Sequence, residues 1–382
     1  MTSGSEAANL VDAHIADVLA RLRGYLAAAG LGGVVLGRAG NVAWASAGIN
    51  PMIDRSAEVE SMWIVVTATR SHLITNVVEA PRLLEEHPVE MAHFDLVTVP
   101  WYGSDEYISV AVHLAGAEPA QVASDLGQPF GIDCTTHVVG LRMTHTELGQ
   151  TRLRALGGDT VSALEDSLAG FEAGSTDLEV QAGLVFELER RGITPSVVIV
   201  GGDDRVRRFR HPSASGRAVK DLLMNVVVGR RQGLHIAVTR TVSVGTLGSL
   251  DRERYLALSR IQSAVLVATQ TAGRYGELYR SLDDAYSREG HPKAWSEHFQ
   301  GGPIGYQQRE FEIAPIQSDS PWFDAPVIAG QAIAFNPSLA GGCKLEDSFL
   351  IAPGGPINLT PPLSWPTLAL PGGGVIAGVL EL

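Results

Sequence analysis

The order of helical and strand-like segments changes near residue 145, and this change constrains the fold more than any other feature of the sequence. Before that point, short β-rich runs alternate with helical stretches, which is typical of an α/β domain. After it, two long helical patterns precede a strand-rich region that contains a second pair of helices. We therefore predict an α/β domain over residues 1–144 and an α+β domain over residues 145–382.

The first domain opens with an amphipathic helix. Residues 5–29 repeat apolar side chains at helical spacing until Gly30 ends the pattern. Short β-branched runs follow it, and we expect strands at 33–37, 62–67 and 95–100. The helical stretch 78–86 separates two of these strands, as an α/β arrangement requires.

The second domain is predicted to be a curved antiparallel sheet backed by helices. Its first two helices are expected at 145–170 and 176–191, and Thr176 followed by Glu179 is typical of a helix N-terminus. The β-rich runs lie at 196–200, 222–228, 235–244, 327–335 and 347–351. Two further helices are expected at 250–271 and 276–289, and the Pro- and Gly-rich stretch 353–374 is expected to be a loop.

Composition narrows the environment and the partners. A net charge of −13 argues against an electrostatic grip on nucleic acid, so a small molecule or a protein is the expected partner. The sequence has no apolar run of about eighteen residues and no signal-peptide pattern, which predicts a cytoplasmic protein with no membrane contact. Arginine outnumbers lysine twenty-six to three, a bias that fits a high-GC bacterial genome.

The two cysteines are expected to be reduced thiols. Cys134 and Cys343 are too few for a disulfide framework and lack the paired spacing of a zinc ribbon. Cys134 and His137 have a spacing that metal sites use, but no second pair accompanies them.

Three segments of the second domain resemble the creatinase, aminopeptidase P and prolidase family, whose catalytic domain has the "pita-bread" fold. The first is 209–244, in which five residues match the family pattern: His211, Asp221, Gly233, Arg240 and Thr241. The second is 298–305 (HFQGGPIG), and the third is 334–347. The resemblance implies a pita-bread fold for residues 145–382, a creatinase-like N-terminal domain and a homodimer.

The resemblance also implies positions for two metal ions, which metal-dependent members hold with two Asp, one His and two Glu. In this chain those positions are occupied by Val227, Ala237, Gly302, Asn336 and Glu346. One carboxylate and one amide cannot hold two divalent cations against water. We therefore expect a metal-independent protein without a cofactor.

Creatinase works without metal and supplies the nearest precedent. The resemblance places His211 at its catalytic histidine and Arg309 at an arginine that holds the substrate carboxylate. Gly302, Asn336 and Thr239 stand where creatinase has its other histidine and two glutamates. A guanidinium substrate would lack its paired carboxylates here, which argues against creatine.

Two histidines are the catalytic candidates. An imidazole with a pKa near 6.5 is the natural proton carrier at neutral pH, and His211 is our first candidate for general acid and base. His298 is the second, and the adjacent Gly301 and Gly302 would let the backbone approach a ligand closely. Either histidine can instead be a hydrogen-bonded turn residue.

The substrate-binding candidates are polar residues near these histidines. Arg309 and Glu310 are predicted to be a carboxylate clamp and its orienting acid, or a plain cross-strand ion pair. Asn336 and Glu346 would face the cavity if the family register holds. Arg55 lies in a loop that resembles one through which a partner subunit reaches the active site, or it belongs to a solvated loop.

Three hypotheses for function follow. The first is a metal-independent hydrolase, or C–N lyase, that acts on a small amino-acid-like or peptide-like substrate in bacterial secondary metabolism, with His211 as acid and base. The second is a catalytically inactive relative that binds a small molecule or pairs with an active paralogue. The third is an Xaa-Pro-type metallopeptidase with rearranged ligands. The sequence contains neither a Gly-x-Ser-x-Gly elbow nor a His-Glu-x-x-His helix, which leaves serine hydrolases and ordinary zincins without support.

Overall fold

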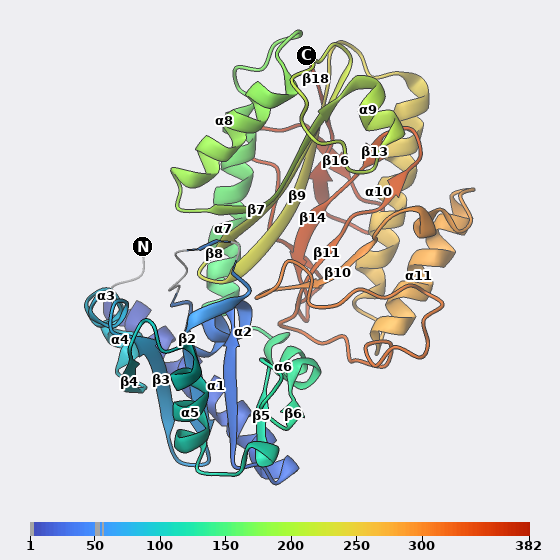
Figure 1. Ribbon diagram of the computed structural model, residues 1–382. Helices are drawn as coiled ribbons and strands as arrows, with labels where there is room; N and C mark the ends of the chain where they lie inside the picture. Colours follow the sequence, from blue (N-terminus) through green and yellow to red (C-terminus); the bar gives the residue numbers. More distant parts are fainter. Residues whose placement is uncertain (1–3, 50–53, 56) are drawn as a thin grey trace. The chain divides into compact units, whose positions relative to one another are not determined.

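The computed structural model describes residues 4–49, 54, 55 and 57–382, and the chain divides into two compact units (Figure 1). Unit 1 comprises Met1–Gly149 with Gln232–Leu234, and unit 2 comprises Gln150–Arg231 with His235–Leu382. Within the described part of the chain, none of the helices has both the length and the apolar character needed to cross a membrane.

Unit 1 is built on a six-stranded mixed sheet with the strand order β4-β3-β2-β1-β5-β6. Its strands are β1 (Gly33–Arg38), β2 (Val59–Thr67), β3 (Ser71–Asn76), β4 (Asp95–Val99), β5 (Val122–Ser124) and β6 (Ile132–Asp133). The pairs β1–β2 and β2–β3 are antiparallel, and the other neighbours are parallel. The α/β class expected for the N-terminal half is confirmed.

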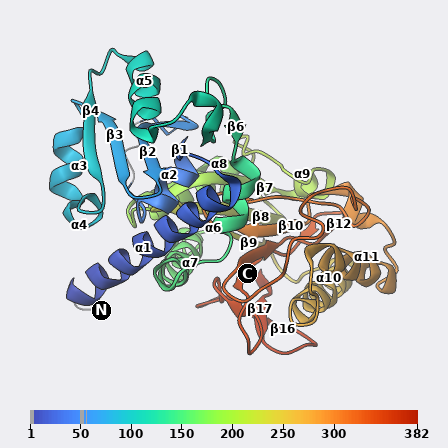
Figure 2. The same ribbon diagram turned by 90° about the horizontal axis from the view of Figure 1, so that it is seen from below.

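Helices cover both faces of this sheet. They are α1 (Gly4–Ala29), α2 (Ala39–Ala45), α3 (Ala80–Glu86), α4 (Pro88–Met91), α5 (Ser104–Ala115), the 3-10 turn η1 (Pro119–Gln121) and α6 (Thr135–Arg142). Ala111 and Ala115 of α5 pack on Val35, Val65 and Ile74 of the sheet. Figures 1 and 2 show α1 on the opposite face, where its apolar stripe is buried.

Unit 2 contains two four-stranded sheets that continue into one another. Their orders are β18-β9-β8-β7 and β10-β11-β14-β15. The strands are β7 (Thr194–Gly202), β8 (Leu222–Arg231), β9 (Leu234–Ser243), β10 (Gly301–Ile304), β11 (Ala332–Phe335), β14 (Asp347–Leu350), β15 (Ile357–Asn358) and β18 (Val379–Glu381). The Thr239 amide donates to the Glu346 carbonyl (3.0 Å), and the Ala237 amide donates to the Ser348 hydroxyl (3.1 Å), so β9 adjoins β14.

Helices flank the sheets of unit 2. They are α7 (Glu147–Ser167), which begins in unit 1, and then α8 (Asp177–Glu189), α9 (Asp203–Arg208), α10 (Ser249–Ala268), α11 (Tyr275–Arg288) and the 3-10 turn η2 (Ala294–Glu297). The α8 N-terminus has the predicted cap: the Glu179 amide donates to the Thr176 hydroxyl, and the Thr176 amide donates to the Glu179 carboxylate. Helices over a sheet of largely antiparallel strands confirm the expected pita-bread class.

A buried arginine fixes the register of the two sheets. Arg240 on β9 donates to the Asp347 carboxylate (3.0 Å) and to the Thr360 carbonyl (2.9 Å), and it lies 3.9 Å from Glu165 of α7. Arg240 and Asp347 therefore point toward the helices. Because side chains alternate along a strand, their neighbours Thr239 and Glu346 point to the opposite side, which we call the inner face.

The C-terminal segment differs from its prediction as a loop. Residues 353–374 contain β15 and β16 (Thr367–Ala369), and β16 pairs with β17 (Val375–Ala377). The strand β18 that follows runs parallel to β9 and completes the first sheet, although only antiparallel pairing was expected.

Two adjacent glycines in α7 provide a test of this packing. A Cβ atom on Gly157 would lie 2.0 Å from the Leu359 carbonyl oxygen, whereas a Cβ atom on Gly158 meets nothing within 4 Å. We expect Gly157→Ala to destabilise the protein by about 1–3 kcal/mol through this overlap. Gly158→Ala should stabilise it by about 0.5–1 kcal/mol, because alanine restricts the unfolded chain and favours helix. Urea unfolding of the two variants checks both signs, and equal effects would contradict the packing.

Candidate functional site

The hairpin of β8 and β9 decides which side chains reach the inner face. Its turn contains only Gln232 and Gly233, whose φ values are 51° and 79°, as a two-residue hairpin turn requires. This turn places Val226 across from Thr239. A Cβ atom on Gly229 would contact Thr160 of α7, so Gly229 and the residues that alternate with it face the helices.

The expected position of the first metal-binding aspartate is therefore wrong by one residue. Val227 shares the helix-facing side with Gly229, and Val226 is the residue that faces inward with Thr239. Met224, on the same side as Val226, lines a small void with His298 and Lys344. The inner face thus carries a valine at this position, and a valine has no donor atom for a cation.

Glu346, the one carboxylate retained at a family ligand position, is engaged by two donors. The Thr239 hydroxyl donates to its Oε2 atom (2.8 Å), and the Lys344 ammonium lies 3.2 Å from the same oxygen. Lys344 and Glu346 are only 5% and 4% exposed. A buried ion pair with an extra hydroxyl donor satisfies this carboxylate without a metal ion.

Gly302, at the family position of the histidine ligand, has no room for a side chain. A Cβ atom there would lie 2.6 Å from the Tyr279 hydroxyl and 3.0 Å from the Phe311 carbonyl oxygen. Gly301 has a φ of 98°, and its Cβ would collide with the Ala334 carbonyl oxygen at 2.1 Å. The Gly301 amide donates to the Glu312 carboxylate (3.2 Å). Both glycines are required by the close approach of β10 to its neighbours.

The residues present do not fit a two-metal site. Four of the five ligand positions of the family, which there carry carboxylates or an imidazole, are occupied on the inner face by Val226, Ala237, Gly302 and Asn336. The fifth position is Glu346, which is paired with Lys344. Across the ranges that the structure describes, no three His, Cys, Asp or Glu side chains are grouped so that they could hold a metal ion. Cys134 and Cys343 are buried free thiols, and burial raises the pKa of Cys343 to about 12.

His211 and His298 form a pair, although 87 positions separate them in sequence. His211 lies in the loop after α9, and His298 follows η2 directly. Their Nε2 atoms are 3.1 Å apart, a hydrogen-bond distance at which one ring donates and the other accepts. His298 and Lys344 line a common void of about 10 Å³, which is roughly the volume of one water molecule. The two catalytic candidates therefore lie together, beside the ammonium.

The surroundings keep both imidazoles neutral. Burial, together with the smaller effects of the Lys344 and Arg210 charges, lowers the pKa of His298 to about 3. The pKa of His211 is also lowered, first by burial and then by Lys344, while Glu346 opposes the shift. A neutral histidine pair can accept a proton at one ring and pass it on through the other.

The other substrate-binding candidates differ from one another in their surroundings. Asn336 is buried at the end of β11, and its Oδ1 atom has no partner among the described residues, as is also true of His298 Nδ1. Arg309 donates to the carbonyl oxygens of Gly302 (3.1 Å) and Ala334 (2.8 Å). The buried Glu310 accepts from the Gln307 amide (3.2 Å). Arg309 therefore binds the backbone of two strands, and its role as a carboxylate clamp stays a prediction.

Arg55 belongs to unit 1 and is exposed. Residues 50–53, which form most of the loop in which we predicted it to act, lie outside the described residues. Its contribution to a site stays a prediction.

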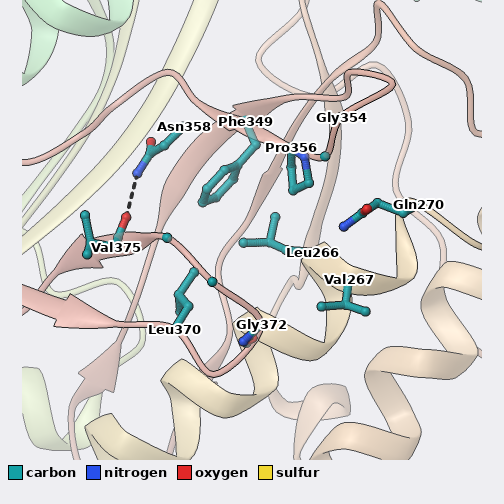
Figure 3. A pocket seen from close by; sticks show the side chains of 14 residues that line it. Leu266, Val267, Gln270, Phe349, Gly354, Pro356, Asn358, Leu370, Gly372 and Val375 are labelled. Carbon is teal, nitrogen blue, oxygen red and sulfur yellow. Dashed lines mark hydrogen bonds between the residues drawn. The ribbon is translucent and has the colours of Figure 1, made fainter.

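Two pockets of unit 2 differ in their chemistry. One, of about 570 Å³, adjoins the histidine pair and is bounded by 295–300 and 312–317. The other, of about 270 Å³, lies between α10 and the C-terminal loops (Figure 3). Gln270 and Asn358 supply amides to the second pocket, and none of its described lining residues is ionisable. Of these two pockets, the first is the one that offers groups for acid–base chemistry.

Lys344 is the candidate site residue that the sequence analysis missed. It lies within the 334–347 motif, two positions before Glu346. The composition held a signal for it, because the chain has three lysines against twenty-six arginines. In a chain with so few lysines, a lysine close to a carboxylate that faces a cavity indicates a position that requires a compact ammonium group instead of a guanidinium.

Comparison with known proteins agrees with this architecture. The chain is similar to an Xaa-Pro dipeptidase from Bacillus anthracis (18% identity, TM-score 0.73, 96% of this chain and 100% of that chain covered). It is also similar to dipeptidase PepE from Mycobacterium ulcerans (20%, 0.73, 97% and 99%). A third similar structure is the N-terminal domain of FACT complex subunit SPT16 from Cicer arietinum, the chickpea (12%, 0.67, 92% and 97%). At these identities the likeness shows a common fold.

Sequence comparison identifies the family. No curated protein matches the chain significantly. The model of metallopeptidase family M24 matches residues 152–353, which is 202 of the 382 residues. The matched range contains the histidine pair, Lys344 and Glu346. The chain therefore belongs to metallopeptidase family M24, the pita-bread family of creatinase, prolidase and aminopeptidase P.

Proposed function

We propose that this chain hydrolyses a C–N bond of a small amino-acid-like or peptide-like molecule without a metal ion, with His211 as general acid and base. The observation that carries the proposal is the Lys344 ammonium on Glu346, at the place where the family pattern calls for a cation. The ammonium supplies one positive charge beside the histidine pair. A fixed positive charge in a buried site stabilises a developing oxyanion, which is a principal contribution of a metal ion in hydrolysis.

In this proposal, side chains of this chain and one water molecule carry out the hydrolysis. His211, with its lowered pKa, is neutral at pH 7 and can accept a proton from water as the water oxygen bonds to the substrate carbonyl carbon. The Lys344 ammonium stabilises the negative charge that develops on the carbonyl oxygen. The C–N bond breaks as the histidine returns its proton to the leaving nitrogen, which departs as a neutral amine. The Nε2 contact with His298 orients the His211 ring for both transfers.

Hydrolysis is preferred to elimination of the same bond. A C–N lyase would use the same imidazole to remove a proton from carbon instead of from water. Membership of a peptidase family favours water as the reactant. The void beside His298, with room for roughly one water molecule, supports the same choice.

A substrate panel tests this proposal. Dipeptides and N-acyl amino acids are incubated with the full chain, with EDTA and separately with added Mn²⁺, Co²⁺ or Zn²⁺, and free amine is measured. We expect at least one compound to be hydrolysed at the same rate in all conditions. Hydrolysis that appears only with added metal would contradict the proposal. So would a protein that is thermally stabilised by panel members without releasing any product.

A further inference from the structure

The pocket beside the histidine pair has a largely apolar wall, although charged residues such as Arg210, Glu297 and Glu312 also line it. Its volume is about 570 Å³, within the range of sites that bind small molecules. Its apolar lining residues come from two segments of unit 2: Trp295, Phe299, Ile313, Ala314 and Pro315. His211 and His298 lie at one end. The reacting groups therefore adjoin an apolar chamber.

Phe299 is the largest uncovered apolar surface of this chamber. Its side chain is 66% exposed, while Trp295 and Gln300 on either side of it in sequence are buried. Its ring centroid is 6.3 Å from that of His298, to which it is joined directly in the chain. An uncovered aromatic ring beside reactive groups is a surface on which an apolar ligand group can pack.

Two of the charged groups around the chamber form an ion pair with each other. Arg210 donates to the Glu297 carboxylate (2.6 Å), so their charges compensate one another. Glu312 accepts the Gly301 amide. A ligand that enters the chamber therefore meets an apolar wall with a neutral histidine pair at its end.

We propose that Phe299 and Ile313 form an apolar subsite that binds an aromatic or branched aliphatic group of the substrate, next to the bond at which the histidine pair acts. This inference rests on the proposed function and specifies its substrate class. The aromatic or branched aliphatic group of the substrate packs on Phe299, and the substrate amide that is hydrolysed lies toward His211. The chamber selects against substrates whose group at this position is only a methyl.

Isothermal titration with two matched probes tests the subsite. L-alanyl-L-phenylalanine and L-alanyl-L-alanine share one backbone and differ by a single ring. We expect the phenylalanine probe to bind the protein at least about tenfold more tightly, and Phe299→Ser to remove about tenfold of that affinity. Phe186→Ser is the matched control, because Phe186 on α8 is 64% exposed and does not line the chamber. It should bind both probes as the unaltered protein does.

Three outcomes would overturn the subsite. They are equal affinity for the two probes, unchanged binding by Phe299→Ser, and a Phe299→Ser variant whose only change is a smaller oligomer in size-exclusion chromatography. The last outcome would assign the ring to an interface between chains.

The titration also separates this inference from the proposed function. Measurement in the His211→Ala background removes turnover, and the ring preference should persist there. Ring-dependent binding without hydrolysis of any panel member would reject the hydrolase and retain the subsite. Hydrolysis that depends on His211 but shows no ring preference would reject the subsite and retain the hydrolase.

Discussion

Replacing His211 with alanine is expected to lower kcat for the substrate found in the panel by about 10²- to 10⁴-fold, the usual contribution of a positioned general acid and base. Its Nε2 atom lies 3.1 Å from that of His298, which is hydrogen-bond distance. His298→Ala should lower kcat less, because His211 keeps its own lone pair when its partner is removed. Steady-state kinetics with the purified full-length variants measures both losses.

A matched control and a pH profile sharpen this test. His291→Ala removes a histidine that lies outside the pocket and should leave kcat unchanged. Because the pKa of His211 lies below its ordinary value of 6.5, the neutral base persists as the pH falls. The acid limb of kcat/KM should therefore lie below pH 6.5. An acid limb above that value, or full turnover by His211→Ala, would contradict the assigned role.

Replacing Lys344 with methionine should have the largest effect on stability. The change leaves the Glu346 carboxylate, which is 4% exposed, without its cationic partner, although the Thr239 hydroxyl still donates to it. Removal of one partner from a buried ion pair costs about 3–5 kcal/mol, since the remaining charge is left uncompensated. Urea unfolding at pH 7 measures the loss, and the same variant should lose turnover even where it remains folded.

A second substitution distinguishes the ion pair from simple packing. Lys344→Met combined with Glu346→Gln removes both charges, and most of the lost stability should return. Turnover should not return, because the positive charge beside the histidines is still absent. Lys220→Met is the control, since Lys220 is exposed and its replacement should change stability by no more than about 0.5 kcal/mol. Equal stability of the Lys344 and Lys220 variants would show that the buried pair is not as described.

The long periodic elements could be predicted from the sequence because their signals are local. The helix predicted at 5–29 is observed as α1, and the capping residues Thr176 and Glu179 mark the start of α8. Strand β18 was missed because it has three residues and pairs with β9, from which about 140 positions separate it. Only the tertiary structure supplies that partner, and local propensity holds no information about it.

The candidate site was harder to predict than the long helices, because its contacts also depend on the tertiary structure. His211 and His298 were each recognised as candidates, but their Nε2 contact depends on loops that are brought together by folding. The error at Val227 follows from the strand period of two, in which a shift of one residue exchanges the inner face for the helix face. Lys344 was missed because a lysine next to a carboxylate usually indicates a solvated ion pair, and burial is not visible in the sequence.

The fold by itself does not decide the chemistry. The similar structures include two dipeptidases and a domain of a FACT complex subunit, at comparable TM-scores. The same scaffold therefore occurs in proteins with different descriptions, and function must be argued from the side chains at the site. In this chain those side chains are the histidine pair and the ion pair of Lys344 with Glu346.

Elemental analysis of the purified full-length protein tests the central claim most directly. The protein is incubated with excess Mn²⁺, Co²⁺ and Zn²⁺ and then freed of loosely bound ions by gel filtration. Because Glu346 is already paired with Lys344 and the other ligand positions carry no charged donor, we predict fewer than about 0.1 metal ion per chain. Stoichiometric Mn, Co or Zn that is lost together with activity on chelation would contradict the account.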